Sequence, residues 1–206
     1  MSLSAEDDSR LREYLSQCRL EQVVTIALCG PRGAGKLSLL RRRSTGMLDD
    51  DDDDQLNRSL WQKREYLHGA WFFVRWTTHT KAKETADTTH SDRIALRGHV
   101  AEADGCLLVY DAASKDSLVG LRQLYETIHE PLHVGDKRKP VVVVANKVDL
   151  VRETEELALR EGIAFAKSID SILIKASAKD AIGFDDMLVE IVSRVVLSWI
   201  SRTDEL

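Results

Sequence analysis

Cysteines are scarce in this sequence, and their arrangement argues against an extracellular, disulfide-bonded fold. There are three, Cys18, Cys29 and Cys106, and they are scattered without a CxxC pair. An odd number in a chain of 206 residues fits a reducing compartment better than a disulfide framework. We therefore expect a cytoplasmic protein.

Signals for membrane insertion or attachment are also missing. No apolar run is long enough to cross a bilayer. Residues 1–10 are polar and acidic, unlike a signal peptide, and residues 201–206 contain no cysteine for prenylation. The sequence therefore predicts no lipid anchor of its own.

An excess of positive charge is absent as well, which disfavours a nucleic-acid partner. The formal net charge is -5, and part of it is the run of six aspartates at 49–54. Successive aspartates repel one another and stay solvated, so we expect a loop over residues 44–60. Apolar residues make up 43% of the chain, which suits one soluble globular domain and, we expect, a monomer.

Apolar, β-branched segments alternate with amphipathic ones along the chain. The segments that read as strands are 23–29, 70–76, 105–110, 141–145 and 172–176. The segments that read as helices are 37–43, 117–129, 153–167 and 184–200, while 81–91 reads as loop. This alternation predicts a three-layer α/β/α fold with a mostly parallel central sheet. Ligands of such sheets bind at the carboxyl ends of the strands.

An N-terminal extension, residues 1–21, precedes the expected domain at 22–200, and a short tail follows at 201–206. Leu11, Tyr14, Leu15 and Cys18 fall on one face of a helix, which Ser9 is suited to cap. We expect this helix to pack on its own domain rather than on a partner.

A glycine-rich loop follows the first strand and precedes a helix. It reads Gly30, Pro31, Arg32, Gly33, Ala34, Gly35, Lys36 and fits the G-x-x-x-x-G-K pattern of a phosphate-binding loop. The glycines let backbone N–H groups converge, and the helix N-terminus and Lys36 add positive charge for phosphates. Leu37 stands where this pattern has a Ser or Thr for Mg²⁺, and Ser38 is rotated by about 100° along the helix.

Polar residues also follow the later strands. Asn146, Lys147 and Asp149 come after 141–145, and Ser177, Ala178 and Lys179 come after 172–176. A carboxylate at Asp149 can accept hydrogen bonds from both the ring N–H and the exocyclic amine of guanine, which adenine lacks on that edge. Lys147 can cover the base with its stem, and Asn146 can tie this loop to the glycine-rich loop.

Taken with the glycine-rich loop, these elements resemble the guanine-recognition motifs of the Ras-like small GTPases. The resemblance covers about residues 22–200, and residues 103–111 look like the central strand of that family. It implies a P-loop G domain that binds GDP or GTP, with the backbone N–H of Ala178 meeting the guanine oxygen.

The family's D-x-x-G element has no clear counterpart, and two registers are possible. One reads Trp-Thr-Thr-His from Trp76, and the other reads Asp-Thr-Thr-His from Asp87. Either way a histidine replaces the glycine, and the residue after it, Thr80 or Ser91, is not the family's glutamine. Residues 44–60 offer no convincing threonine for Mg²⁺, and Arg32 should crowd the space used for water attack.

The retained and missing elements leave several hypotheses open. The first is a guanine-nucleotide-binding signalling or trafficking protein with weak or absent hydrolysis and a doubtful need for magnesium. The second is a pseudo-GTPase scaffold that binds no nucleotide. The third is a working GTPase that uses Ser38, Asp87 or His90, and the fourth is a P-loop kinase or ATPase, which Asn146 and Asp149 disfavour. No residue is assigned as catalytic or as a metal ligand.

Overall fold

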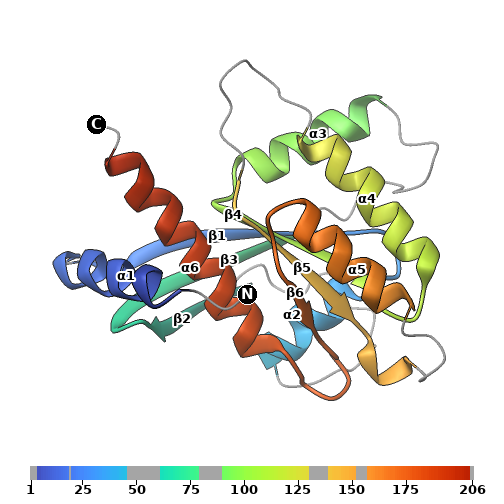
Figure 1. Ribbon diagram of the computed structural model, residues 1–206, viewed down its shortest axis with the longest axis horizontal. Coiled ribbons are helices and arrows are strands. Elements are labelled where there is room, and N and C mark those ends of the chain that lie inside the picture. Colours follow the sequence, from blue (N-terminus) through green and yellow to red (C-terminus); the bar gives the residue numbers. More distant parts are fainter. Residues whose placement is uncertain are drawn as a thin grey trace.

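The structure is a computed structural model, and it describes residues 4–18, 20–45, 61–78, 90–129, 139–151 and 157–204. Its centre is a six-stranded sheet in the order β2-β3-β1-β4-β5-β6 (Figure 1). The strands are β1 (Gln22–Cys29), β2 (Gln62–Leu67), β3 (Ala70–Thr78), β4 (Gly105–Asp111), β5 (Val141–Asn146) and β6 (Leu173–Lys175). The β2–β3 pair is antiparallel and the other pairs are parallel, so the sheet is mostly parallel, as the sequence predicts.

Helices cover both faces of the sheet and complete the predicted three layers (Figure 1). The helices that share one core with the sheet are α1 (Ala5–Gln17), α2 (Lys36–Thr45) and α6 (Phe184–Thr203). The helices that share the other core are α3 (His90–Ala101), α4 (Lys115–His129) and α5 (Leu157–Ser168). Within the described ranges, none of the helices combines the length and apolar character needed to span a bilayer.

The central strands are apolar along their whole length because both of their faces are covered. Every residue of β5 is buried, and so is all of β4 except Asp111. Side chains of β4 alternate between the two cores, with Leu107 and Val109 in one and Cys106, Leu108 and Tyr110 in the other. Continuous β-branched runs of this kind are typical of doubly covered parallel strands.

One strand and one α-helix of the fold were not predicted from the sequence. Strand β2 reads QKREYL, and three of its six residues are exposed because it forms the edge of the sheet. Helix α3 includes Ser91, so the predicted loop at 81–91 is wrong at its end, and residues 79–89 lie outside the described ranges. Strand β2 is too polar for hydrophobic periodicity to reveal, and α3 begins with a polar turn.

Several predicted boundaries shift by a few residues. Helix α2 continues to Thr45, so the predicted loop at 44–60 is wrong for its first two residues, and residues 46–60 lie outside the described ranges. The first part of the helix predicted at 153–167 also falls outside the described ranges, and α5 begins at Leu157. At the C-terminus, α6 runs through the predicted tail as far as Thr203.

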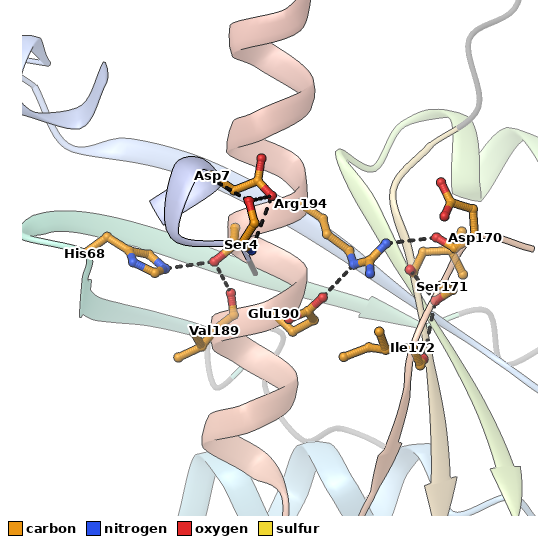
Figure 2. A network of polar contacts seen from close by, with 11 residues as sticks. Ser4, Asp7, His68, Asp170, Ser171, Ile172, Val189, Glu190 and Arg194 are labelled. Atoms are coloured by element: carbon orange, nitrogen blue, oxygen red, sulfur yellow. Dashed lines mark hydrogen bonds and ion pairs between the residues drawn. The ribbon is translucent and has the colours of Figure 1, made fainter. Parts of the chain in front are cut away.

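Helix α1 packs on the rest of the chain beside α6, as predicted (Figure 1). Leu11 and Leu15 are buried in the core, and Arg10 forms a 2.9 Å ion pair with Asp204. The predicted cap is wrong, because Ser4 rather than Ser9 caps the helix through a capping box with Asp7 (Figure 2).

The β2–β3 turn is also joined to α6 by a polar contact (Figure 2). His68, at a left-handed φ of 49°, places its Nε2 atom 2.8 Å from Ser193 Oγ. Ser193 directs its hydroxyl proton to the Val189 carbonyl at 2.6 Å, so the imidazole Nε2–H is the donor to Ser193. The Nδ1 atom of His68 lies 3.5 Å from Asp8 on α1, so three elements meet at this ring.

Candidate functional site

The glycine-rich loop lies between β1 and α2, in the backbone setting that its sequence pattern requires. Gly33 and Gly35 have φ values of 82° and 83°, which side-chain-bearing residues rarely adopt. A Cβ atom at Gly35 would collide with the side-chain amide of Asn146, and one at Gly30 would collide with the Val109 carbonyl. The glycines are therefore needed both for the turn and for its close contact with the neighbouring strands.

Lys36 is the first residue of α2, and its side chain folds back over the loop. Its ammonium donates to the carbonyl oxygen of Pro31 at 3.0 Å and to that of Gly30. A full positive charge thus lies beside the N-terminus of a helix, where the backbone dipole is also positive. This arrangement suits an anionic group such as a phosphate.

Asn146, at the end of β5, joins the glycine-rich loop to the two loops at the far side of the sheet. Its side chain is fully buried, and its Nδ2 donates to the Ala34 carbonyl at 2.8 Å. Its Oδ1 accepts the backbone N–H of Ala178 at 3.4 Å. The tie expected between Asn146 and the glycine-rich loop is therefore present, and it extends to the loop after β6.

The carboxylate of Asp149 is held by the loop that contains Ser177. Asp149 lies in a short 3-10 helix, Val148–Leu150, and its Oδ1 accepts the Ser177 hydroxyl at 2.7 Å. Ser177 is fully buried, and its Oγ accepts the backbone N–H of Asp180 at 3.0 Å. A carboxylate fixed in this way can present its remaining lone pairs to a pair of N–H donors.

Lys147 makes an ion pair that sequence reasoning missed. Its Nζ lies 2.8 Å from Oδ2 of Asp111, the last residue of β4. The only sequence signal for this partner was a carboxylate directly after a buried strand. Because β4 and β5 are parallel neighbours, with Asp111 opposite Asn146, their carboxyl ends bring the two charges together.

Other predicted residues lie around the same loops. Arg32 and Ser38 are exposed, and so is Lys179 in the loop after β6. The side chain of Leu37 is on the first turn of α2 and is 39% exposed. It offers only carbon atoms to a ligand.

The described residues do not provide the ligand set that Mg²⁺ prefers at this edge. Strand β3 ends in Thr77 and Thr78, so its described end carries hydroxyls and no carboxylate. No group of three His, Cys, Asp or Glu in the described ranges is placed to hold a metal ion. The oxygen of Thr78 is buried and lacks a hydrogen-bond partner within these ranges. Among the described residues, the end of β3 therefore offers hydroxyl groups and not the carboxylate oxygens that Mg²⁺ prefers.

The two possible registers of the D-x-x-G element begin at Trp76 and at Asp87, and the structure describes only part of each. Trp76 is only 8% exposed and lies in the core with Leu39 and Leu40, so its side chain belongs to the packing of the domain. Asp87 and His79 lie outside the described residues, and His90 is the first residue of α3.

Comparison with known proteins gives a match to the model of the Ras family over residues 25–197. The chain is 25% identical to the Ras and EF-hand domain-containing protein homolog of Caenorhabditis elegans, over 85% of this chain and 26% of that protein. It is 34% identical to Ras-related protein Rab-17 of Homo sapiens, over 50% of this chain and 45% of that protein. It is 22% identical to Ras-related protein RabZ of Dictyostelium discoideum, over 90% of this chain and 76% of that protein. The chain thus covers about a quarter of the first of these relatives and under half of the second.

Proposed function

Because the chain belongs to the Ras family, we propose that it is a small guanine-nucleotide-binding protein with weak or absent GTP hydrolysis. It acts as a cytoplasmic signalling or trafficking switch or adaptor. The Ras and Rab names of its relatives support this role at the level of the family.

The observation that carries the proposal is the fixed carboxylate of Asp149. The Ser177 hydroxyl orients it at 2.7 Å, and the backbone of Ala178 is held nearby through Asn146. Guanine has two N–H donors on the edge that a carboxylate can accept, and its oxygen accepts a backbone N–H. Adenine has neither donor there, so it would leave the remaining lone pairs of Asp149 without partners.

The other end of the site supports binding of a phosphate. The carbonyl oxygen of Ala34 accepts the Asn146 amide, which joins the glycine-rich loop to the base-recognition loop. Lys36 and the N-terminus of α2 supply positive charge at that loop. A nucleotide has anionic phosphates at one end and a base at the other. The glycine-rich loop suits the phosphates, and the loop with Asp149 suits the base.

We expect weak GTP hydrolysis because groups that phosphoryl transfer needs are missing from the described part of the site. Leu37 cannot ligate Mg²⁺, and the described end of β3 supplies no carboxylate to its coordination shell. Arg32 places a long side chain on the tip of the glycine-rich loop. Transfer of a phosphoryl group relies on a positioned metal ion and an oriented water molecule, so their loss slows it.

A second candidate function is a pseudo-GTPase scaffold that binds no nucleotide, which the apolar Leu37 favours. Isothermal titration of nucleotide-stripped protein with GDP and GTP, in Mg²⁺ and in EDTA, separates the two, with ATP as the control ligand. Tight GDP binding that is similar in both buffers supports the proposal. If the folded protein binds neither GDP nor GTP, the nucleotide-binding proposal is rejected in favour of the scaffold. If binding strictly requires Mg²⁺ and the protein hydrolyses GTP over multiple turnovers, the result supports a working GTPase.

Asp149→Asn tests the base-recognition half separately. The amide keeps the size of the carboxylate but replaces one acceptor oxygen with an N–H₂ donor, which opposes the exocyclic amine of guanine. Xanthine has a carbonyl at that position, so the variant should lose GDP and gain xanthosine diphosphate. Equal affinity of the variant and the wild type for GDP would reject Asp149 as the base acceptor.

A further inference from the structure

The Asp111 carboxylate is oriented at each of its oxygen atoms. Oδ2 accepts the Lys147 ammonium at 2.8 Å, and Oδ1 accepts the backbone N–H of Ala113 at 3.0 Å. The backbone N–H of Asp111 donates to the Ser117 hydroxyl at 2.9 Å, which ties the residue to α4. The carboxylate therefore presents a fixed anionic point at the end of β4.

Lys147, the partner of Asp111 in this ion pair, has an unusual backbone conformation. Its φ and ψ of 61° and 36° are left-handed, which is uncommon for a residue with a long side chain. A Cβ atom built on Gly35 would lie 3.6 Å from Lys147 Cε, so the stem passes over the glycine-rich loop. The side chain thus runs between that loop and Asp111.

The ion pair between Lys147 and Asp111 is partly shielded from water. The side chains of Lys147 and Asp111 are 32% and 18% exposed, respectively. Ion pairs on open surfaces contribute little because solvent screens them and long side chains remain mobile. Here Oδ1 of Asp111 accepts the backbone N–H of Ala113, and the Asp111 backbone N–H donates to Ser117, so less side-chain freedom remains to be lost when the base arrives.

We propose that Asp111 is a positioning residue for guanine, because it fixes the Lys147 ammonium so that the apolar stem forms one wall of the base site. Lys147 directly follows β5, which ends at Asn146, and Asp149 lies two residues further along the chain. The ligand class is a guanine nucleotide, and the inference rests on the proposed function. Asp111 itself contacts the lysine and not the nucleotide.

The test compares GDP with inorganic pyrophosphate, which has the phosphates and no base. Affinities and GDP release rates are measured for the wild type, Asp111→Asn, Lys147→Met and the double variant. The methionine keeps an unbranched apolar stem and removes the charge. Asp116→Asn, an exposed aspartate in the first turn of α4, is the matched control.

Asp111→Asn is expected to weaken GDP binding and speed its release by roughly three- to tenfold, the range of a partly buried charged contact. Pyrophosphate binding should be unchanged, and the double variant should be no weaker than either single one, because both remove the same anchor. Asp111→Glu, which keeps the charge, should recover part of the loss.

Three results would overturn the inference. If Asp111→Asn binds GDP as tightly as the wild type, the ion pair with Lys147 does not contribute to guanine binding. Equal losses for GDP and pyrophosphate would show that Asp111 supports the whole edge of the sheet and not the base wall. If the wild type binds pyrophosphate and no GDP, the proposed function fails first, and the role of Asp111 is rejected with it.

Discussion

The side-chain amide of Asn146 donates a 2.8 Å hydrogen bond to the backbone carbonyl of Ala34, 112 residues earlier in the chain. This bond connects the end of β5 with the loop that follows β1, although β4 lies between these two strands in the sheet. The same side chain accepts the N–H of Ala178 from the loop after β6. One buried amide therefore fixes the relative positions of three loops.

Asn146→Ala should destabilise the fold and weaken nucleotide binding together. The change leaves the buried carbonyl of Ala34 and N–H of Ala178 without their partner, at a cost of about 1–3 kcal/mol. Urea unfolding measures the free energy, and titration with GDP measures the affinity. Gln123→Ala, which removes an exposed amide from α4, is the control and should change neither. Equal stability of the two variants would contradict this role.

Leu37→Ser should make GDP binding more dependent on Mg²⁺. It places a hydroxyl on the first turn of α2, directly after Lys36, where the phosphate-binding pattern has its metal ligand. Leu37 is 39% exposed, so the loss of apolar burial should cost no more than about 1 kcal/mol. Titrations in Mg²⁺ and in EDTA provide the measurement.

Leu37→Ala is the matched control for that substitution, because it removes the same apolar surface without adding an oxygen. The ratio of GDP affinities in Mg²⁺ and EDTA should rise by roughly threefold or more in the serine variant and stay at the wild-type value in the alanine variant. An identical ratio in both variants would mean that the remaining metal ligands are too few for one hydroxyl to matter.

Much of the fold could be predicted because its central strands are continuously apolar. Segments such as Val141–Asn146 and Gly105–Asp111 have no polar residue before their last position, and this pattern is typical of a parallel sheet covered on both faces. Strand β2 could not be predicted, because an edge strand buries too little surface to impose alternation on its sequence. Helix α3 was missed for a different reason, because its polar first turn continues the polar sequence at 81–89.

The candidate site divides in the same way. Asn146 and Asp149 stand at fixed spacings after a strand, so sequence alone could place them at the ligand-binding edge. The ion pair of Asp111 with Lys147 depends on which strands are neighbours, and a lone aspartate after a strand carries no such information. The cap at Ser4 was missed because Ser4 and Ser9 both suit an N-cap, and only packing decides where α1 begins.

Thiol labelling should separate Cys18 from the two cysteines in the sheet. A side-chain hydrogen bond with Cys29, together with complete burial, raises the pKa of Cys106 well above its ordinary value. A raised pKa keeps the thiol protonated near neutral pH, and the thiolate is the reactive form. Cys29 is also buried, whereas Cys18 lies at the partly exposed end of α1.

Maleimide treatment of the native protein should therefore modify Cys18 first, as measured by intact-protein mass spectrometry over time. In urea all three cysteines should react at similar rates, because unfolding removes the burial that distinguishes them. A Cys18→Ser variant should show almost no early labelling in its native state. Rapid modification of that variant would contradict the packing of β1 against β4.

His68 and Ser193 should be energetically coupled, since the imidazole donates to a hydroxyl that is fully buried in α6. We expect His68→Ala and Ser193→Ala to destabilise the protein by about 1–2 kcal/mol each, and the double variant to cost less than the sum of the two. Asp8→Asn should have a much smaller effect, because Asp8 is 40% exposed and its carboxylate lies 3.5 Å from the ring. Urea unfolding of the four variants measures these free energies. Strict additivity of His68→Ala and Ser193→Ala would mean that the β2–β3 turn is held on α6 by apolar packing, and that this contact contributes nothing of its own.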